Sequence, residues 1–166
     1  TNYKLSDKAK SYIITSRYYL GGYTAPEGVM TNQFYAYERG TLRYDTSRPL
    51  YWDGMVGLMY PSDYGYAAGN SCVTGTAPYN YNGGCRNKDW LWMTNSSDYT
   101  NGYEWLMSPR SSLTITASSV NSVGYVGNNG YIVNYANSVR PVFYLTSDVS
   151  ISGGTGTSSD PYIATK

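Results

Sequence analysis

The sequence predicts an α+β protein, a single domain over residues 1–166, in which one or two helices pack on a twisted antiparallel sheet with long loops. Three observations predict this class. A chain of 166 residues suits one domain with its own core. One clear helical pattern lies near the N-terminus, and several short extended segments fill the second half. Gly, Asn and Ser residues separate these segments in the manner of turns.

The clearest helical pattern runs over residues 7–19. Ser6 is a typical N-cap, and Gly21-Gly22 is a typical stop. A helix of this length suits packing on a sheet, and the alternative is that it continues a helix lying upstream. One face of the predicted helix carries Leu5, Ala9, Tyr12, Ile13, Ser16 and Leu20.

The following segments predict two strands and a short second helix. Side chains alternate over residues 31–41, and an apolar run covers 55–60, so each segment predicts a strand. Residues 45–54 between them predict a loop. Pro61 ends the second strand, and Ser62-Asp63 predict the start of a brief helix that Gly69 stops.

The second half of the chain predicts an antiparallel meander. A long polar loop over 69–103 precedes it, which the run 89–93 ties to the core. The tryptophans Trp52, Trp90, Trp92 and Trp105 are expected mainly in the core. Residues 127–130, Gly-Asn-Asn-Gly, predict a hairpin turn, and the C-terminal tail predicts an edge strand. The short extended segments are 104–107, 113–116, 122–126, 131–135 and 139–145.

The composition favours molecular recognition over catalysis. The chain contains 21 Tyr and no His, so Ser-His-Asp and Cys-His mechanisms within the chain are excluded. Tyr combined with Ser, Gly and Asn is typical of binding surfaces; the alternative is that many tyrosines fill half-buried sheet positions. Charged residues make up only 14% and the net charge is +1, so no nucleic-acid partner is expected and an extracellular surface is favoured.

Cys72 and Cys85 frame a short polar segment without helical or strand periodicity. We predict a disulfide between them, which indicates an oxidising compartment. The alternative is a pair of buried free thiols. No segment is apolar over the length that a membrane helix needs, so no membrane insertion of this chain is expected, and a leader, anchor or stalk is expected upstream of Thr1.

Residues 57–69, Gly-Leu-Met-Tyr-Pro-Ser-Asp-Tyr-Gly-Tyr-Ala-Ala-Gly, resemble the strand, proline, acidic helix and Ala-Ala-x-Gly signature of formylglycine-generating-enzyme-like domains. These domains belong to the C-type-lectin-like superfamily. Residues 102–109 look like the Trp-Glu-Trp and Gly-Gly-Ser-Trp region of that family, and residues 139–143 look like its closing Gly-Phe-Arg strand. The order and spacing of the three segments agree with the family, and the resemblance implies a C-type-lectin-like fold.

A closer resemblance, spanning nearly the whole chain, is to secreted or pilin-like surface proteins of gut Firmicutes and their relatives. It is carried by residues 20–23, 37–40, 58–67, 89–91 and 140–142. The tail, residues 154–157 with 160–162, is similar to a short ending of bacterial cell-surface proteins. This resemblance implies an extracellular location, on a bacterial cell surface or pilus.

The known chemistries of the superfamily do not fit this chain. Formylglycine formation needs a reactive cysteine pair in a late region, whereas Cys72 and Cys85 lie early, and the related sulfoxide synthases bind iron through histidines. The remaining use of the fold is a scaffold that displays a variable binding face. In relatives diversified by retroelements, the variable segment precedes the final Arg-containing strand, here residues 118–138. Its Asn, Tyr and Ser bias is what adenine-directed mutagenesis leaves, although we favour an ordinary surface hairpin over actual diversification.

We therefore expect a non-enzymatic, adhesin-like domain that binds a protein or glycan on another cell or a host surface, with no cofactor. The alternatives are a pilin-like subunit that assembles into a pilus or fibre, and a glycan hydrolase using two carboxylates. Calcium is the most compatible metal, with Asp98, Asn101 and Glu104 as candidate ligands; structural ion pairs, Glu38 with Arg39 and Glu104 with Arg140, are the other expected use of the acids. The expected ligand-binding residues are Tyr99, Asn101, Tyr103, Tyr125, Asn128, Asn129, Tyr131, Asn134, Tyr135 and Asn137.

Overall fold

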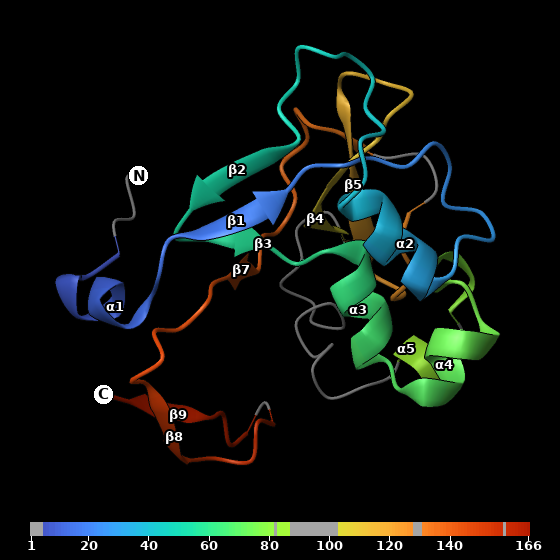
Figure 1. Ribbon diagram of the computed structural model, residues 1–166. Coiled ribbons are helices and arrows are strands. Elements are labelled where there is room, and N and C mark those ends of the chain that lie inside the picture. Colours follow the sequence, from blue (N-terminus) through green and yellow to red (C-terminus); the bar gives the residue numbers. More distant parts are fainter. Residues whose placement is uncertain (1–4, 82, 87–102, 128–130, 158) are drawn as a thin grey trace.

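A computed structural model describes residues 5–81, 83–86, 103–127, 131–157 and 159–166 (Figure 1). Helices and small antiparallel sheets are mixed along the described chain, which is compatible with the predicted α+β class. The helices are α1 (Asp7–Tyr12), α2 (Thr31–Glu38), α3 (Pro61–Ala67), α4 (Asn70–Gly75), α5 (Gly83–Arg86) and the 3-10 helix η1 (Pro78–Asn80). The strands are β1 (Ser16–Tyr19), β2 (Tyr51–Gly54), β3 (Gly57–Leu58), β4 (Tyr103–Pro109), β5 (Thr116–Asn121), β6 (Tyr131–Ile132), β7 (Pro141–Val142), β8 (Ser150–Gly153) and β9 (Ile163–Thr165).

The strands form several small sheets instead of one large one. β4, β5 and β6 form an antiparallel meander, as predicted for the second half of the chain. The pairs β1–β2, β3–β7 and β8–β9 form two-stranded antiparallel sheets. The predicted strands 131–135 and 139–145 are present as the shorter strands β6 and β7. The predicted strands 113–116 and 122–126 are wrong, because β5 covers the residues between them. The tail does become strand, but β9 pairs with β8 in a hairpin of its own.

The core lies between the β4–β5 sheet and the helices α2, α3 and α4 (Figure 1). Gly65 of α3 packs directly on Thr31 of α2, because a Cβ at this glycine would lie 2.3 Å from the Thr31 hydroxyl oxygen. Alternate side chains of β4 point into the core, as expected for a sheet with one buried face. The core cluster consists of Tyr23, Phe34, Met59, Tyr64, Ala68, Cys72, Tyr81, Cys85, Leu106, Val120 and Val126.

The first predicted helix is much shorter than expected. Ser6 caps it as predicted, accepting a hydrogen bond from the backbone N–H of Ala9 at 3.1 Å, but the helix ends at Tyr12. The β-branched run over residues 13–15 explains the early end, since such residues restrict side-chain rotation in a helix and suit extended backbone. Residues 16–19 form β1, and Tyr18 is buried there. The prediction of a helix over 7–19 and of a loop over 45–54 is therefore wrong for β1 and its partner β2.

The predicted strand 31–41 is a helix, α2. Its buried residues are Thr31, Phe34 and Glu38, which are spaced at three and four residues and so lie on one helical face. The Gln33 side chain accepts a hydrogen bond from the backbone N–H of Met30 at 2.8 Å and satisfies one donor at the first turn. Alternating tyrosines indicate a strand, but the helical period becomes visible only when the acid Glu38 is included among the buried positions.

α3 agrees with the predicted short helix, beginning at Pro61 in the first helical position. The assignment of Trp52 to the core is wrong, because its side chain is 45% exposed and stacks on the buried ring of Tyr18. Trp105 is half-buried, and Trp90 and Trp92 lie outside the described residues.

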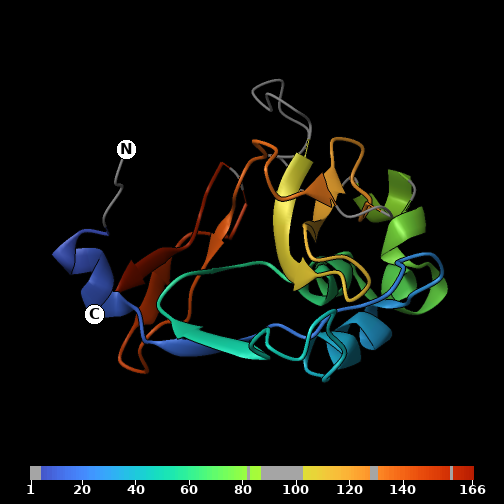
Figure 2. The ribbon, with the colours of Figure 1, turned by 90° about the horizontal axis from the view of Figure 1, so that it is seen from above.

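Both ends of the described chain lie together, away from the β4–β5 sheet (Figures 1 and 2). Ile14 donates a backbone hydrogen bond to Tyr144, and the Lys166 side chain donates to the Ser11 carbonyl and pairs with Asp148 at 2.9 Å. α1 contributes no buried residue. No described helix combines the length and the apolar character that a membrane crossing requires.

Candidate functional site

Two glutamates are buried in the core region, and both are engaged with arginines as predicted. Glu104 on β4 pairs with Arg140 at 3.0 Å, and Glu38 at the end of α2 pairs with Arg39 at 3.3 Å. Ser62 donates its backbone N–H and its hydroxyl to the Glu38 carboxylate. Burial raises the pKa of Glu38 to about 7, although the two hydrogen bonds from Ser62 lower it.

The predicted disulfide between Cys72 and Cys85 is present. It joins α4 to α5, and both cysteines belong to the core cluster. α5 has only four residues, too few to be stable as an isolated helix. The disulfide therefore anchors this helix, and Arg86 at its end, to α4. The predicted disulfide therefore restricts the position of Arg86 as well as that of the loop it closes.

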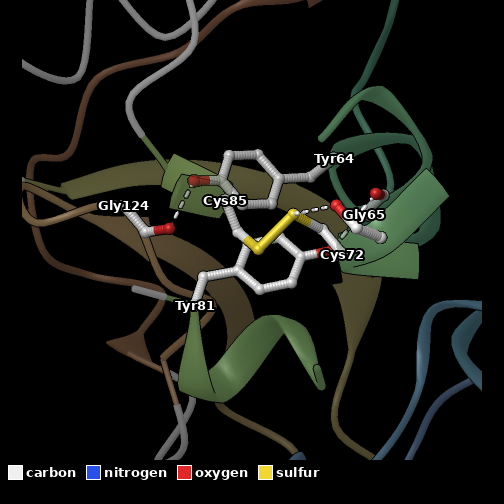
Figure 3. The surroundings of a disulfide bond; sticks show 7 residues. Tyr64, Gly65, Cys72, Tyr81, Cys85 and Gly124 are labelled. Carbon is white, nitrogen blue, oxygen red and sulfur yellow. Dashed lines mark hydrogen bonds between the residues drawn. A yellow bond between two sulfur atoms is a disulfide. The ribbon is translucent and has the colours of Figure 1, made fainter. Parts of the chain in front are cut away.

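Two core tyrosines support the disulfide region (Figure 3). The rings of Tyr64 and Tyr81 stack at a centroid distance of 6.0 Å. Their hydroxyls point in opposite directions, Tyr64 donating to the Gly124 carbonyl and Tyr81 donating to the Gly65 carbonyl at 3.1 Å. Burial raises the pKa of both phenols, so both stay protonated donors at neutral pH. The pair thereby ties α3 to the turn that follows β5.

That turn is organised by Asn121. Its side-chain oxygen accepts the backbone N–H groups of Val123 and Tyr125, each at 3.1 Å. Gly124 lies between them with a φ of +86°, a conformation that favours glycine. The Val126 backbone N–H then donates to the Pro78 carbonyl at 3.1 Å, which joins the turn to η1. Tyr125 is therefore held against η1 and α5.

A polar pocket of about 300 Å³ lies where η1, α5 and this turn meet. The rings of Tyr79 and Tyr125 meet edge to face at 6.1 Å. Asn80 contributes an amide, and Arg86 contributes a guanidinium. The lining residues are Tyr79, Asn80, Tyr81, Arg86 and Tyr125. Aromatic faces, hydroxyls, an amide and one positive charge can hold a polar ligand that also presents C–H surface.

Among the predicted ligand-binding residues, Tyr125 lines this pocket, and Tyr103 lies on the strand next to the turn that carries Tyr125. Tyr103 is half-buried and pairs in register with Asn121. Asn137 lies next to Ser138, whose backbone N–H donates to the Tyr103 carbonyl at 3.0 Å. These positions gather near the Asn121 end of β5.

The other predicted positions lie elsewhere. The backbone of Tyr131 pairs with Ala117 in the β5–β6 ladder. Tyr135 is 54% exposed, Asn134 is exposed, and the Tyr135 backbone N–H donates to Ile132 at 3.1 Å. Because β6 pairs with the Thr116 end of β5, these residues lie at the end of that strand opposite Asn121. The strand spans about 17 Å between Thr116 and Asn121. Tyr99, Asn101, Asn128 and Asn129 lie outside the described residues.

Sequence reasoning missed four of the five pocket residues, Tyr79, Asn80, Tyr81 and Arg86. A signal was present, because the segment Tyr-Asn-Tyr lies inside the loop that the two cysteines close, and Arg86 directly follows Cys85. A stapled loop rich in tyrosine and amide side chains presents them in a fixed arrangement. The analysis instead placed the binding face on the longer unstapled segments.

A second tyrosine-rich surface, which the sequence did not predict, consists of Tyr19, Tyr35, Arg39 and Tyr66, and we call it the α2 stripe. Arg39 lies 3.6 Å over the Tyr35 ring, and Tyr35 meets Tyr66 edge to face at 6.4 Å. The stripe continues to Tyr19, whose ring lies 5.7 Å from the Arg39 guanidinium. It depends on α2 being a helix, which places residues 35 and 39 on one face.

An apolar pocket of about 350 Å³ lies apart from the polar one, among the β2, β3, β4 and β7 region. The described residues that line it combine the exposed Trp52 with aliphatic side chains, and none of them carries a charge. Its lining residues are Trp52, Val56, Gly57, Leu58, Met107, Val139 and Pro141.

The metal prediction finds no further support. Within the described ranges, no group of three or more His, Cys, Asp or Glu side chains could hold a metal ion. Asp98 and Asn101 lie outside those ranges, and Glu104 is buried against Arg140. Calcium therefore stays the untested alternative to the expected absence of a cofactor.

Comparison of the chain with protein-family models, with curated proteins and with solved structures finds no match.

Proposed function

We propose that this chain is a non-enzymatic extracellular recognition domain that binds a glycan or protein ligand, and that the polar pocket between η1, α5 and the turn after β5 is its binding site. The observation that carries the proposal is the lining itself: three tyrosines, an amide and a guanidinium around a cavity of about 300 Å³. Such a set of rigid aromatic faces and polar groups is typical of ligand sites.

The pocket is pre-organised, which supports a binding role. The disulfide holds the α5 wall to α4, and the Tyr64 hydrogen bond to Gly124 holds the wall formed by the turn to α3. The Val126 hydrogen bond to Pro78 joins the turn to the η1 wall. Side chains held in this way lose little conformational entropy when a ligand binds. A loop stapled by a disulfide also suits an oxidising compartment, so the proposal includes an extracellular location.

The proposal includes a C-type-lectin-like fold, in which a scaffold presents loops for recognition. The resemblance of residues 57–69 supports it, since they form β3, a proline and the short helix α3 in the order of the family signature. The early cysteine pair is consumed in a disulfide, which agrees with a binding role instead of formylglycine chemistry.

The test is a binding screen on glycan and cell-surface protein arrays, followed by titration of any ligand with variants. We expect Asn80→Ala, whose side chain is exposed, and Tyr125→Ala to weaken binding at least tenfold. Tyr125 also packs against the core, so its variant needs a melting curve beside it.

Two matched tyrosine variants decide between surfaces. Tyr135→Ala probes the predicted hairpin face, and Tyr35→Ala probes the α2 stripe; both rings are exposed. If either abolishes binding while the pocket variants bind as the wild type does, the pocket is the wrong site.

A second candidate function, a subunit of a pilus or fibre, is favoured by the β8–β9 hairpin. All seven residues of its two strands are exposed or half-buried, and Ile151 and Ile163 are 53% and 57% exposed. A two-stranded hairpin has two unpaired edges and little stability of its own, so pairing with another subunit would stabilise it. Light scattering over a concentration series tests this: Ile151→Lys should abolish any self-association, and a strictly monomeric wild type would refute it.

A further inference from the structure

Arg86 differs from every other arginine of the chain. The sequence contains seven arginines, and all of them lie in the described residues. Arg17, Arg39 and Arg140 pair with acids, and the guanidiniums of Arg43, Arg48 and Arg110 donate to backbone carbonyls. In the part of the chain that the structure describes, Arg86 alone has neither an acid nor a carbonyl as a partner. Arg86 lines the polar pocket, and its charge lies near enough to act on the Tyr64 hydroxyl.

The stem of Arg86 is nevertheless fixed. Its Cβ lies close over Gly124, where an added Cβ would approach it to 2.7 Å. The neighbouring Cys85 is held by the disulfide to Cys72. Because both the backbone and the stem are anchored, the guanidinium has a restricted position before any ligand arrives. This is the arrangement expected of a binding group and not of a freely solvated surface side chain.

The electrostatics of the pocket favour an anion. The five lining residues include one cation and no acid. Glu104, the buried acid that influences the neighbouring Tyr64 hydroxyl, is neutralised by Arg140. An arginine side chain offers a planar pair of N–H donors that fits a carboxylate in a bidentate manner. A carboxylate is therefore the group that satisfies Arg86 best.

The remaining lining indicates what carries the carboxylate. The volume of about 300 Å³ is at the lower end of small-molecule sites, which suits one ring-sized unit. Tyr79 and Tyr125 offer aromatic surface for the C–H groups of such a ring, and Asn80 and the phenol hydroxyls offer hydrogen bonds. A pyranose with a carboxylate substituent combines these features.

We infer that the polar pocket selects an acidic sugar, and that Arg86 binds its carboxylate while the Tyr79 and Tyr125 rings contact the sugar ring. The inference rests on the proposed function, because it names the ligand class of that same site. Arg86 is then the residue that decides between acidic and neutral sugars.

The experiment measures binding of three probes by isothermal titration calorimetry or by ligand-observed NMR. Methyl β-D-glucuronide and methyl β-D-glucoside differ only in a carboxylate against a hydroxymethyl group, and acetate supplies the carboxylate without the sugar. We expect the glucuronide to bind the wild type 10- to 100-fold more tightly than the glucoside, the range of a charge-assisted hydrogen-bonded contact. Acetate should bind more weakly than the glucuronide.

The variants isolate the role of Arg86. Arg86→Gln should remove the preference for the glucuronide, because it should weaken glucuronide binding about 10- to 100-fold more than glucoside binding. Arg86→Lys should retain a part of the preference because it keeps the charge without the bidentate geometry. Gly124→Ala leaves Arg86 in the sequence but displaces its stem, so it should also reduce the preference and serves if Arg86→Gln does not fold.

Three outcomes overturn the inference: equal wild-type affinity for the two glycosides, acetate binding as tightly as the glucuronide, or no binding of the glucuronide. None of these by itself refutes the proposed function, which fails separately if pocket variants bind the ligands of the array screen as tightly as the wild type does.

Discussion

The buried glutamate at the end of α2 predicts an unusual dependence of stability on pH. Glu38 is 1% exposed, and burial raises its pKa from 4.5 to about 7. In the unfolded chain the carboxyl ionises near its ordinary value, so between these two values the folded state holds a proton that the unfolded state has lost. The contribution of this group to stability is complete below pH 4.5 and is lost as the pH rises towards 7.

The size of this effect follows from the two pKa values. One pH unit of difference corresponds to about 1.4 kcal/mol, so the interval between 4.5 and about 7 corresponds to about 3 kcal/mol. The chain contains no histidine, so no imidazole titrates in this interval. The exposed carboxyls of Asp45, Asp53 and Asp148 have lowered pKa values and titrate below it.

The assay is urea unfolding from pH 4.5 to 7.5 at constant ionic strength, with Glu38→Gln and Glu27→Gln as the variants. We expect the free energy of unfolding of the wild type to fall by as much as about 3 kcal/mol across this range. Glu38→Gln should remove the dependence, because an amide can accept from the Ser62 backbone N–H and donate to its hydroxyl oxygen without titrating. Glu27 is exposed, so its variant should follow the wild type.

A wild-type stability that is flat or rises between pH 4.5 and 7 would refute this reasoning. It would show that the two donors of Ser62 and the Arg39 pair stabilise the carboxylate more than burial destabilises it.

Three further predictions concern the contacts around the site. Reduction of the disulfide, which closes a loop with a sequence separation of 13, should lower the free energy of unfolding by about 3 kcal/mol in the chain-entropy description, seen as a shift of the urea midpoint on adding reductant. Gly124→Ala should destabilise by about 1 to 2 kcal/mol in thermal unfolding, because its φ of +86° disfavours alanine; an unchanged melting temperature would contradict the turn geometry. Arg140→Met should cost about 3 kcal/mol by urea unfolding, since it leaves Glu104 buried without its cation, and a loss below about 1 kcal/mol would contradict a buried pair.

The disulfide and the Glu38–Arg39 ion pair were predictable because both follow from short-range chemistry. Cys72 and Cys85 frame a short polar segment without helical or strand periodicity, and Glu38 is followed directly by Arg39. The meander of β4, β5 and β6 was also predictable, since turn residues separate short extended segments. These features need no knowledge of which distant segments meet.

The errors in the first half have two different physical causes. At β1 the β-branched residues 13–15 end the helix, a local preference that the apolar stripe over 7–19 concealed. In α2, local preference and tertiary burial disagree, because tyrosines favour strands while the Thr31, Phe34 and Glu38 spacing favours a helix. Tertiary packing decided the outcome, since the helix places Phe34 in the core and Thr31 on Gly65. A pattern search that admitted a buried acid would have found the helical period.

The polar pocket could not be predicted because its walls are far apart in sequence. Tyr79 and Arg86 belong to the stapled loop, whereas Tyr125 follows β5, and a backbone hydrogen bond from Val126 to Pro78 brings them together. Only Tyr125 was singled out, for its chemistry and not for its neighbours. Composition indicates that tyrosines are available for binding, and the fold determines which of them share a cavity.

The contacts that build the core also set the position of the binding groups. The Tyr64 ring is fully buried among core residues, yet its hydroxyl holds the Gly124 carbonyl, and Gly124 in turn supports the stem of Arg86. Tyr64→Phe would keep the ring in the core but release this carbonyl, so it separates core packing from positioning of the turn. Expressed as free energies, the loss of the preference for a carboxylate should exceed the loss of stability. If the two effects were equal in size, the turn would be only a structural element, and Arg86 would not depend on it for its position.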